Sequence, residues 1–180
     1  MRVYTCNMSR TSSRELLQPW VALPCACATV RRLGRLATRF YDVEMRPAGM
    51  ETGQFTLLAT IRHVPGISQI YIARRLGMDT TSLTRTLGVL LKNGWVEKAQ
   101  GSDRRSRVFT ITRAGEAQLL RARPYWQRAQ QRFVSIVGAD GTKALVEAVE
   151  AVALALNAEV ADLHRARRSA RVRKRDARAR

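Results

Sequence analysis

The stretch "MDTTSLTRTLGVLLKNGW" (residues 78–95) begins with polar residues and ends with apolar ones. Its polar front consists of Asp79, Thr80, Thr81, Ser82 and Thr84, with Arg85 directly behind. Leucines then recur at steps of three and four, the spacing that places side chains on one face of a helix. Because threonine is a mediocre helix former, the polar front needs a reason other than helix propensity.

The residues before this stretch predict a second, shorter helix. "SQIYIARRLGM" (68–78) offers Ser68 as its N-cap and Gly77 as a left-handed turn at its end. Two short helices joined by a tight glycine turn form a helix-turn-helix, whose second helix enters the DNA major groove with its N-terminal residues first. Short hydroxyls permit close approach, and Arg85 can reach guanine or a phosphate. Hydroxyls also gather at helix starts merely to cap them, so this motif alone leaves both interpretations open.

A basic hairpin follows the two helices. "WVEKAQ" (95–100) and "RVFTIT" (107–112) predict strands, and "GSDRRS" (101–106) is the polar turn between them. In this position a basic hairpin is a wing, whose arginines can enter a narrow minor groove. We interpret Asp103 as the ion-pair partner that orients Arg105. The alternative is an ordinary exposed, charged turn.

The flanking segments predict further helices. Residues 24–46 and 50–64 show helical spacing, with Thr52 as a candidate cap of the second. A long helix is expected after Thr112, and "VGADGTK" (137–143) breaks it. The last helix carries an apolar stripe formed by Leu145, Val149, Val152, Leu156, Val160 and Leu163.

The net charge of +18 predicts an anionic partner, either nucleic acid or an anionic membrane surface. The segment 165–180 holds nine Arg or Lys and one Asp, a net +8, so the rest of the chain carries +10. Repulsion among these arginines favours disorder of 165–180 in the absence of a polyanion. Its simplest expected role is additional, non-specific phosphate contact.

Several classes of protein are disfavoured. No apolar run approaches the roughly 20 residues that span a bilayer, and residues 1–23 read as a flexible leader without a convincing signal peptide, so we expect a cytoplasmic protein that associates with the bacterial nucleoid when bound. The two histidines, His63 and His164, lie far apart, and no nucleotide-binding or catalytic-triad motif is present. We expect no enzyme activity, no cofactor and no metal site.

The sequence resembles the MarR family of winged helix-turn-helix regulators. "GMDTTSLTRTLGVLLKNGWVEK" and "DRRSRVFTITRAGE" look like the family's recognition helix, its wing and the entry to its fifth helix. The resemblance covers about 25–163 and implies a mainly α fold with a small β-wing. It also implies that a winged helix-turn-helix DNA-binding lobe (50–113) is joined to a helical dimerisation region (24–48 and 114–164).

The resemblance further implies a homodimer on a pseudo-palindromic double-stranded DNA operator, most often as a repressor that a small effector releases. The exposed stripe of the last helix independently suggests a partner surface. The residues expected to contact DNA are Ser68, Gln69, Thr80, Thr81, Ser82, Thr84, Arg85, Asp103, Arg104, Arg105 and Arg107.

Two inputs are considered for the switch. Family members commonly bind aromatic carboxylates or phenolics, and the candidate lining residues here are Phe40, Tyr41, His63 and Trp126. One branch of the family senses organic hydroperoxides through a cysteine at the place of Cys27, with a tyrosine matching Tyr41. Arg31 stands where that branch has its other tyrosine, and a nearby cation can lower a thiol pKa. Buried, inert packing of Cys25 and Cys27 is the favoured alternative. A general nucleic-acid-coating protein, in which charge matters and the recognition helix does not, is the competing function.

Overall fold

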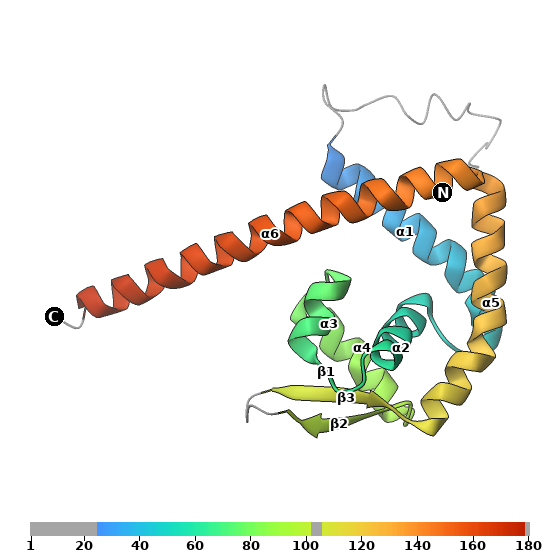
Figure 1. Ribbon diagram of the computed structural model, residues 1–180, viewed down its shortest axis with the longest axis horizontal. Coiled ribbons are helices and arrows are strands. Elements are labelled where there is room, and N and C mark those ends of the chain that lie inside the picture. The colour runs from blue at the N-terminus through green and yellow to red at the C-terminus, as the bar shows by residue number, and fades with distance from the viewer. Residues whose placement is uncertain (1–24, 102–105, 179–180) are drawn as a thin grey trace, which may run out of the picture. The chain divides into compact units, whose positions relative to one another are not determined.

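The computed structural model describes residues 25–101 and 106–178 (Figure 1). Its helices and strands, in chain order, are α1 (Ala26–Met45), the 3-10 turn η2 (Arg46–Ala48), α2 (Thr52–His63), β1 (Ile67–Ser68), α3 (Gln69–Leu76), α4 (Thr80–Lys92), β2 (Val96–Gln100), β3 (Arg107–Ile111), α5 (Arg113–Val137) and α6 (Ala139–Arg178). The fold is mainly α-helical with one small antiparallel sheet, which confirms the winged helix-turn-helix class.

Helix ends follow local side-chain chemistry, with one correction. The Ser68 hydroxyl accepts a hydrogen bond from the Tyr71 amide, and Gly77 adopts φ 60°, so both predicted ends of α3 are confirmed. The predicted cap of α2 was wrong, because Glu51 and not Thr52 is the N-cap. Glu51 has an extended backbone and forms a reciprocal capping box with Gln54. The Thr52 amide instead donates to Asp42 Oδ1 at 2.8 Å.

The sheet contains a strand that the sequence did not predict. β1 has only two residues and pairs antiparallel with β3, with Ile67 opposite Phe109. β3 also pairs with β2 over five residues, so the strand order is β1-β3-β2. Two residues are too few to show alternation, and the pairing joins positions about forty apart. β1 therefore ties the start of the helix-turn-helix to the wing.

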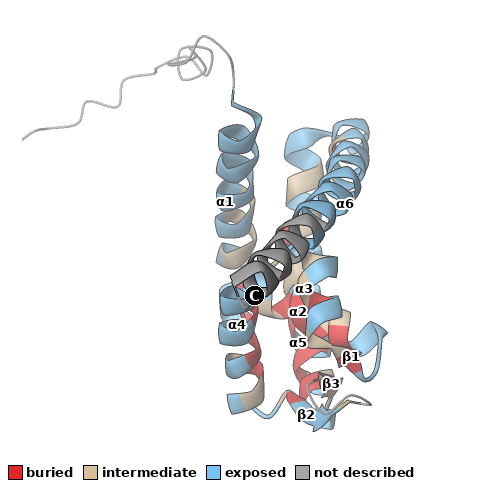
Figure 2. Cartoon of the chain, turned by 90° about the vertical axis from the view of Figure 1, so that its left-hand side faces the viewer, coloured by how far each residue is buried: buried red, intermediate tan, exposed pale blue. Residues whose placement is uncertain are grey.

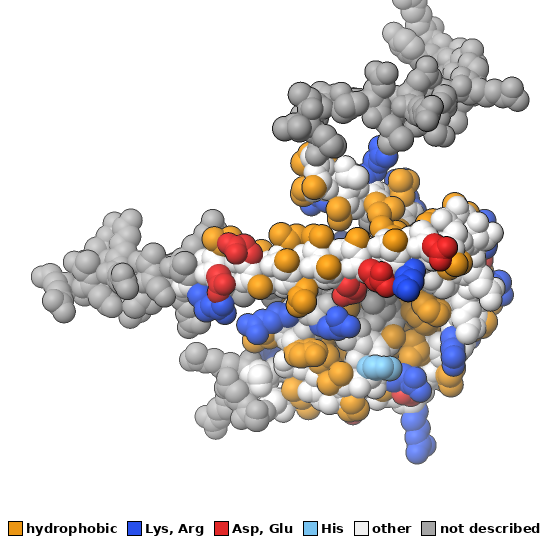
Figure 3. Space-filling view, turned by 45° about the horizontal axis from the view of Figure 1, so that its top comes forward, with side chains coloured by type: hydrophobic (Ala, Val, Ile, Leu, Met, Phe, Trp, Pro, Cys, Tyr) orange, Lys and Arg blue, Asp and Glu red, His pale blue; other side chains and the backbone are white. Residues whose placement is uncertain are grey.

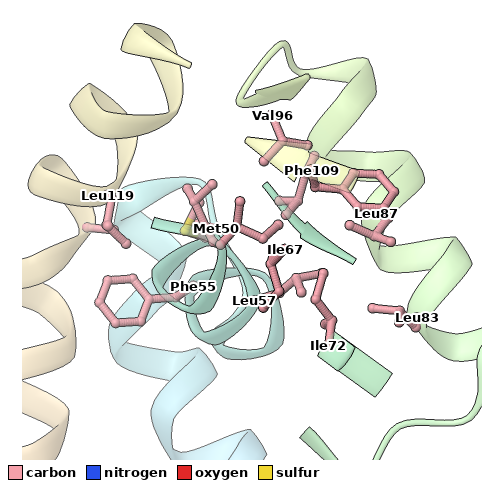
Figure 4. Packing of buried hydrophobic residues seen from close by; sticks show 14 of the residues in the cluster. Met50, Phe55, Leu57, Ile67, Ile72, Leu83, Leu87, Val96, Phe109 and Leu119 are labelled. Atoms are coloured by element: carbon pink, nitrogen blue, oxygen red, sulfur yellow. The ribbon is translucent and has the colours of Figure 1, made fainter. Parts of the chain in front are cut away.

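One core of buried side chains holds this lobe together. It includes Leu57 and Ile61 from α2, Leu83 from α4 and Phe109 from β3, all nearly inaccessible to solvent (Figure 4). Buried residues gather around α2 and the sheet, whereas the first part of α1 is mostly exposed (Figure 2). The predicted anchoring role of the α4 leucines is confirmed for Leu83, Leu87 and Leu90, while Leu91 is only partly buried.

The base of the wing is locked to the start of α5. The Thr112 hydroxyl donates to the Gly94 carbonyl at 2.6 Å and accepts from the Gly115 amide. The Thr112 amide donates to the Trp95 carbonyl at 3.1 Å. One threonine therefore caps α5 and fastens it to the turn that follows α4.

The chain divides into two compact units, residues 1–39 and 40–180, so the boundary falls inside α1. The division into a dimerisation region and a DNA-binding lobe remains a prediction. α6 continues through Arg178, whereas the sequence favoured disorder for 165–180. Alanine and arginine are good helix formers and oppose the charge repulsion. Within the described residues, no helix combines the length and apolarity needed to cross a membrane.

Candidate nucleic-acid interface

The N-terminal end of α4 presents polar side chains to solvent. Thr80, Thr81, Ser82, Thr84 and Arg85 are all exposed, while the leucines on the other face of the helix are buried. The helix is thus held from one side, and its polar front is free to approach another surface. The free N–H groups at the start of a helix favour phosphate at the same place.

Asp79 caps this end of α4. Its Oδ1 accepts from the Ser82 amide at 2.9 Å and its Oδ2 accepts from the Ser82 hydroxyl at 2.6 Å. Hydrogen bonds from the Ser82 hydroxyl and then from its amide hold the pKa of Asp79 below its usual value. Ser82 therefore has a structural role in addition to the predicted contact with DNA.

The lowered pKa of Asp79 predicts a specific dependence of stability on pH. The folded state favours the carboxylate, so the stabilisation is complete above the unfolded pKa of about 3.9 and is lost as the pH falls through the lower folded pKa. Below pH ~4, the melting temperature of the wild type should fall more steeply than that of Asp79→Asn, whose amide caps without titrating. Thermal unfolding between pH 7 and 3 measures both, and parallel curves would contradict the assignment.

A hydrogen bond joins the two helices of the motif. Gln69 at the start of α3 donates from Nε2 to Thr84 Oγ1 on α4 at 3.0 Å. Ser68 lies next to it and caps α3. Two predicted DNA-contacting residues thus stand at the front of α3, beside the polar front of α4. Any surface that touches one helix front also meets the other.

A cavity of about 370 Å³ gathers cations beside these fronts. Its walls include Ser68, Gln69 and Thr80, together with Arg74 from α3 and Arg107 from the first position of β3. The structure therefore brings predicted residues from three elements to one place. Sequence reasoning missed Arg74, although its position four and five residues after Ile70 and Gln69 on a short helix was a usable signal. The predicted wing residues Asp103, Arg104 and Arg105 lie outside the described residues.

Two comparisons identify the family to which this arrangement belongs. The MarR family profile matches residues 48–106, which contain α2, the helix-turn-helix and β2. The transcriptional regulator MosR of M. tuberculosis, solved in complex with DNA, is 32% identical to this chain, with a TM-score of 0.66 over 75% of this chain and 98% of MosR. This chain belongs to the MarR family of winged helix-turn-helix transcriptional regulators.

Two other proteins extend the comparison. The HTH-type transcriptional regulator YwoH of Bacillus subtilis is 28% identical over 87 residues, which are 48% of this MarR-family chain and 64% of YwoH, somewhat less than two thirds of that relative. PcaV of Streptomyces coelicolor, solved with its natural ligand, is 20% identical, with a TM-score of 0.65 over 76% of this chain and 99% of PcaV. At that identity the likeness concerns the fold.

The four predicted ligand-contacting residues of this MarR-family chain fall into two groups. Phe40 and Tyr41 pack around Phe133, with ring centroids about 6 Å apart. The Tyr41 hydroxyl donates to Gln130 Oε1 at 2.6 Å, and burial raises the Tyr41 pKa. These two residues therefore form a packed aromatic cluster instead of joining His63 and Trp126.

His63 and Trp126 do lie together, at a second cavity of about 370 Å³ between α2, α3 and α5. Sequence reasoning missed three other wall residues, Phe55, Tyr71 and Arg75. Tyr71 and Arg75 belong to the helix-turn-helix and were read only as part of its first helix. No local signal connected them to α5, because the contact joins segments about fifty residues apart.

The redox candidates lie at the start of α1. Cys25 and Cys27 are free and exposed in this chain, which differs from the buried packing that the sequence favoured. Alanine-rich surroundings suggested burial, but this part of α1 belongs to the unit that ends at Arg39 and has few side chains around it. Arg31 is also exposed and lines a shallow arginine-rich surface with Arg35 and Arg39.

Proposed function

We propose that this protein is a sequence-specific double-stranded-DNA-binding repressor that acts as a homodimer and is released by an aromatic or phenolic effector. The observation that carries the proposal is the single face formed by the exposed front of α4, the front of α3 and the cations Arg74 and Arg107. MosR, at 32% identity, is solved in complex with DNA, which supports the same partner here.

The homodimer is supported by apolar side chains that a single chain leaves in water. Val149, Val152, Leu156, Val160 and Leu163 of the α6 stripe are all roughly half exposed. Hydrophobic side chains are visible along α6 in Figure 3. Continuous apolar surface of this kind marks an interaction site, and a two-fold dimer buries the same patch on both copies. Two recognition helices then read half-sites about 34–36 Å apart. A dimer seated on its operator blocks transcription there, hence repression.

Arg85 provides the test of sequence-specific binding. Arg85→Gln should lower affinity for the preferred duplex about ten- to hundredfold and reduce discrimination at one base pair, as expected for a base-contacting arginine. The duplex is obtained by selection from a random library with the wild-type protein. Binding is measured by fluorescence anisotropy against scrambled DNA at near-physiological salt.

Lys92→Gln is the matched control for Arg85→Gln. Lys92 is exposed at the other end of α4, so its substitution removes the same charge but leaves the helix front intact. It should change specific and scrambled binding little and equally. If both substitutions weaken both duplexes alike, the protein coats nucleic acid through charge and is not a sequence-specific regulator.

The effector part of the proposal rests on the cavity at His63 and Trp126. PcaV, which shares this fold, is solved with its natural ligand. A cavity of about 370 Å³ lies within the range of small-molecule sites, and its stacked Phe55 and Trp126 rings suit a flat apolar compound. An effector that binds one arrangement of the protein better than another shifts the population toward it and releases DNA.

Thiol control is the second candidate, favoured by the exposure of Cys25 and Cys27. Under effector control, an organic hydroperoxide should leave both wild type and Cys27→Ser bound to the duplex in a gel shift. Under thiol control, the hydroperoxide would oxidise the Cys27 thiolate to a sulfenic acid and be reduced to the alcohol. The wild type would then be released, and Cys27→Ser would stay bound.

The basic segment 165–180 adds to this proposal as a non-specific arm. With a net charge of +8 it can neutralise phosphates outside the operator. Each phosphate neutralised contributes about −0.9 to the slope of log K against log salt. We assign this segment to affinity and not to sequence preference.

A further inference from the structure

We infer that the cavity between α2, α3 and α5 binds a flat apolar molecule bearing one acidic group, and that its occupant controls DNA binding through α3, the first helix of the helix-turn-helix. This assignment rests on the DNA-binding function proposed above and names the effector site and its route of action. Three features carry it: the shape and apolarity of the cavity, the position of Arg75, and a second cavity on the other side of α3.

The walls of the cavity suit a planar apolar body. Phe55 from α2 and Trp126 from α5 stack with ring centroids 5.7 Å apart and planes 18° apart. Ala59 and Val64 add aliphatic surface beside the two rings. The volume of about 370 Å³ accommodates one or two fused aromatic rings with a small substituent.

The polar groups of the cavity select an anion. Arg75 stands four residues after Tyr71 on α3, so both side chains lie on the side of the helix that lines this cavity. Within the described parts of the chain, no ion pair occupies the Arg75 guanidinium. No acidic residue is among the wall residues, so a carboxylate meets a cation and no repelling charge. The Tyr71 hydroxyl and His63 are further hydrogen-bonding groups at the same wall.

α3 separates this cavity from the DNA-facing one. Tyr71 and Arg75 line the effector cavity, whereas Gln69 and the neighbouring Arg74 line the cavity beside Thr80 and Arg107. α3 has only eight residues, so a displacement on one side is carried directly to the other. Gln69 also bonds Thr84 on the recognition helix at 3.0 Å. An occupant that moves Tyr71 and Arg75 therefore changes how both helix fronts meet DNA, within one lobe and without a change in the spacing of two lobes.

The adjacent arginines of α3 provide the test. Binding of 2-naphthoate and of its neutral amide, 2-naphthamide, is measured by titration calorimetry on the full-length protein. Arg75→Gln should weaken 2-naphthoate binding about tenfold and leave 2-naphthamide unchanged, because only the acid uses the guanidinium. Arg74→Gln, the matched control one residue away, should keep both ligand affinities and weaken duplex binding instead.

Coupling to DNA is measured with the selected duplex. Saturating 2-naphthoate should lower the duplex affinity of the wild type at least about fivefold, and the duplex should lower 2-naphthoate affinity by the same factor. In Arg75→Gln the same ligand concentration should have a much smaller effect.

Three results would overturn the inference: no 2-naphthoate binding at millimolar concentration, equal effects of the two substitutions on it, or ligand binding that leaves duplex affinity unchanged. Each of these is distinguishable from failure of the proposed function, because duplex binding by the ligand-free wild type is measured first. Specific binding that survives without ligand sensitivity would remove only the effector site.

Discussion

Replacing Leu156 with glutamate should convert the protein to monomers and abolish high-affinity operator binding. Leu156 lies in the middle of the α6 stripe and is 59% exposed in the single chain. A two-fold interface would bury two introduced carboxylates, each costing several kcal/mol without a partner. At 1.4 kcal/mol per tenfold, the dimer dissociation constant should rise more than about a thousandfold. Sedimentation velocity measures the association state, and anisotropy measures binding to the selected duplex.

Leu154→Glu is the matched control on the same helix. Leu154 is 75% exposed and lies two residues from both Val152 and Leu156, which places it on the opposite side of α6 from the stripe. It should leave the dimer and the operator affinity nearly unchanged. Dimers that persist in Leu156→Glu would show that the stripe does not form the interface, and dissociation in both variants would show that any added charge on α6 suffices.

Replacing Gly115 with alanine should destabilise the winged lobe by about 3 kcal/mol, the upper end of the usual cost of overpacking. A Cβ at Gly115 would stand 2.0 Å from the Trp95 carbonyl oxygen and 2.8 Å from Ile111 Cγ1. The carbonyl belongs to the backbone and accepts the Thr112 amide, so it cannot move without opening the base of the wing. Denaturant unfolding monitored by tryptophan fluorescence measures the change in free energy of unfolding.

Gly88→Ala is the companion substitution. Gly88 is exposed in α4, and nothing lies within 4 Å of a Cβ built there. Alanine favours a helix interior over glycine by up to about 1 kcal/mol, so this variant should be more stable than the wild type. Equal effects of the two substitutions would mean that the close approach at Trp95 has no energetic consequence.

Much of the lobe is predictable from sequence because its signals are local. The caps at Ser68 and Asp79 depend on atoms within three residues, and the φ of 60° at Gly77 follows from a glycine at the end of a short helix. The DNA-facing residues of α3 and α4 follow from the same helical spacing. The choice of Thr52 over Glu51 as the cap of α2 failed because it rested on residue preference alone, whereas the capping box with Gln54 decides that end.

The sequence alone determined that this chain forms a helix-turn-helix followed by a basic hairpin, since side-chain spacing and turn residues act over a few positions. Only the tertiary structure decided that Tyr71 and Arg75 meet Trp126 around one cavity, while Phe40 and Tyr41 pack elsewhere. It also decided that Ile67 pairs with Phe109, and that the Trp95 carbonyl leaves no room for a side chain at Gly115. These contacts join residues tens of positions apart, and they depend on how the helices and strands pack, which no short pattern encodes.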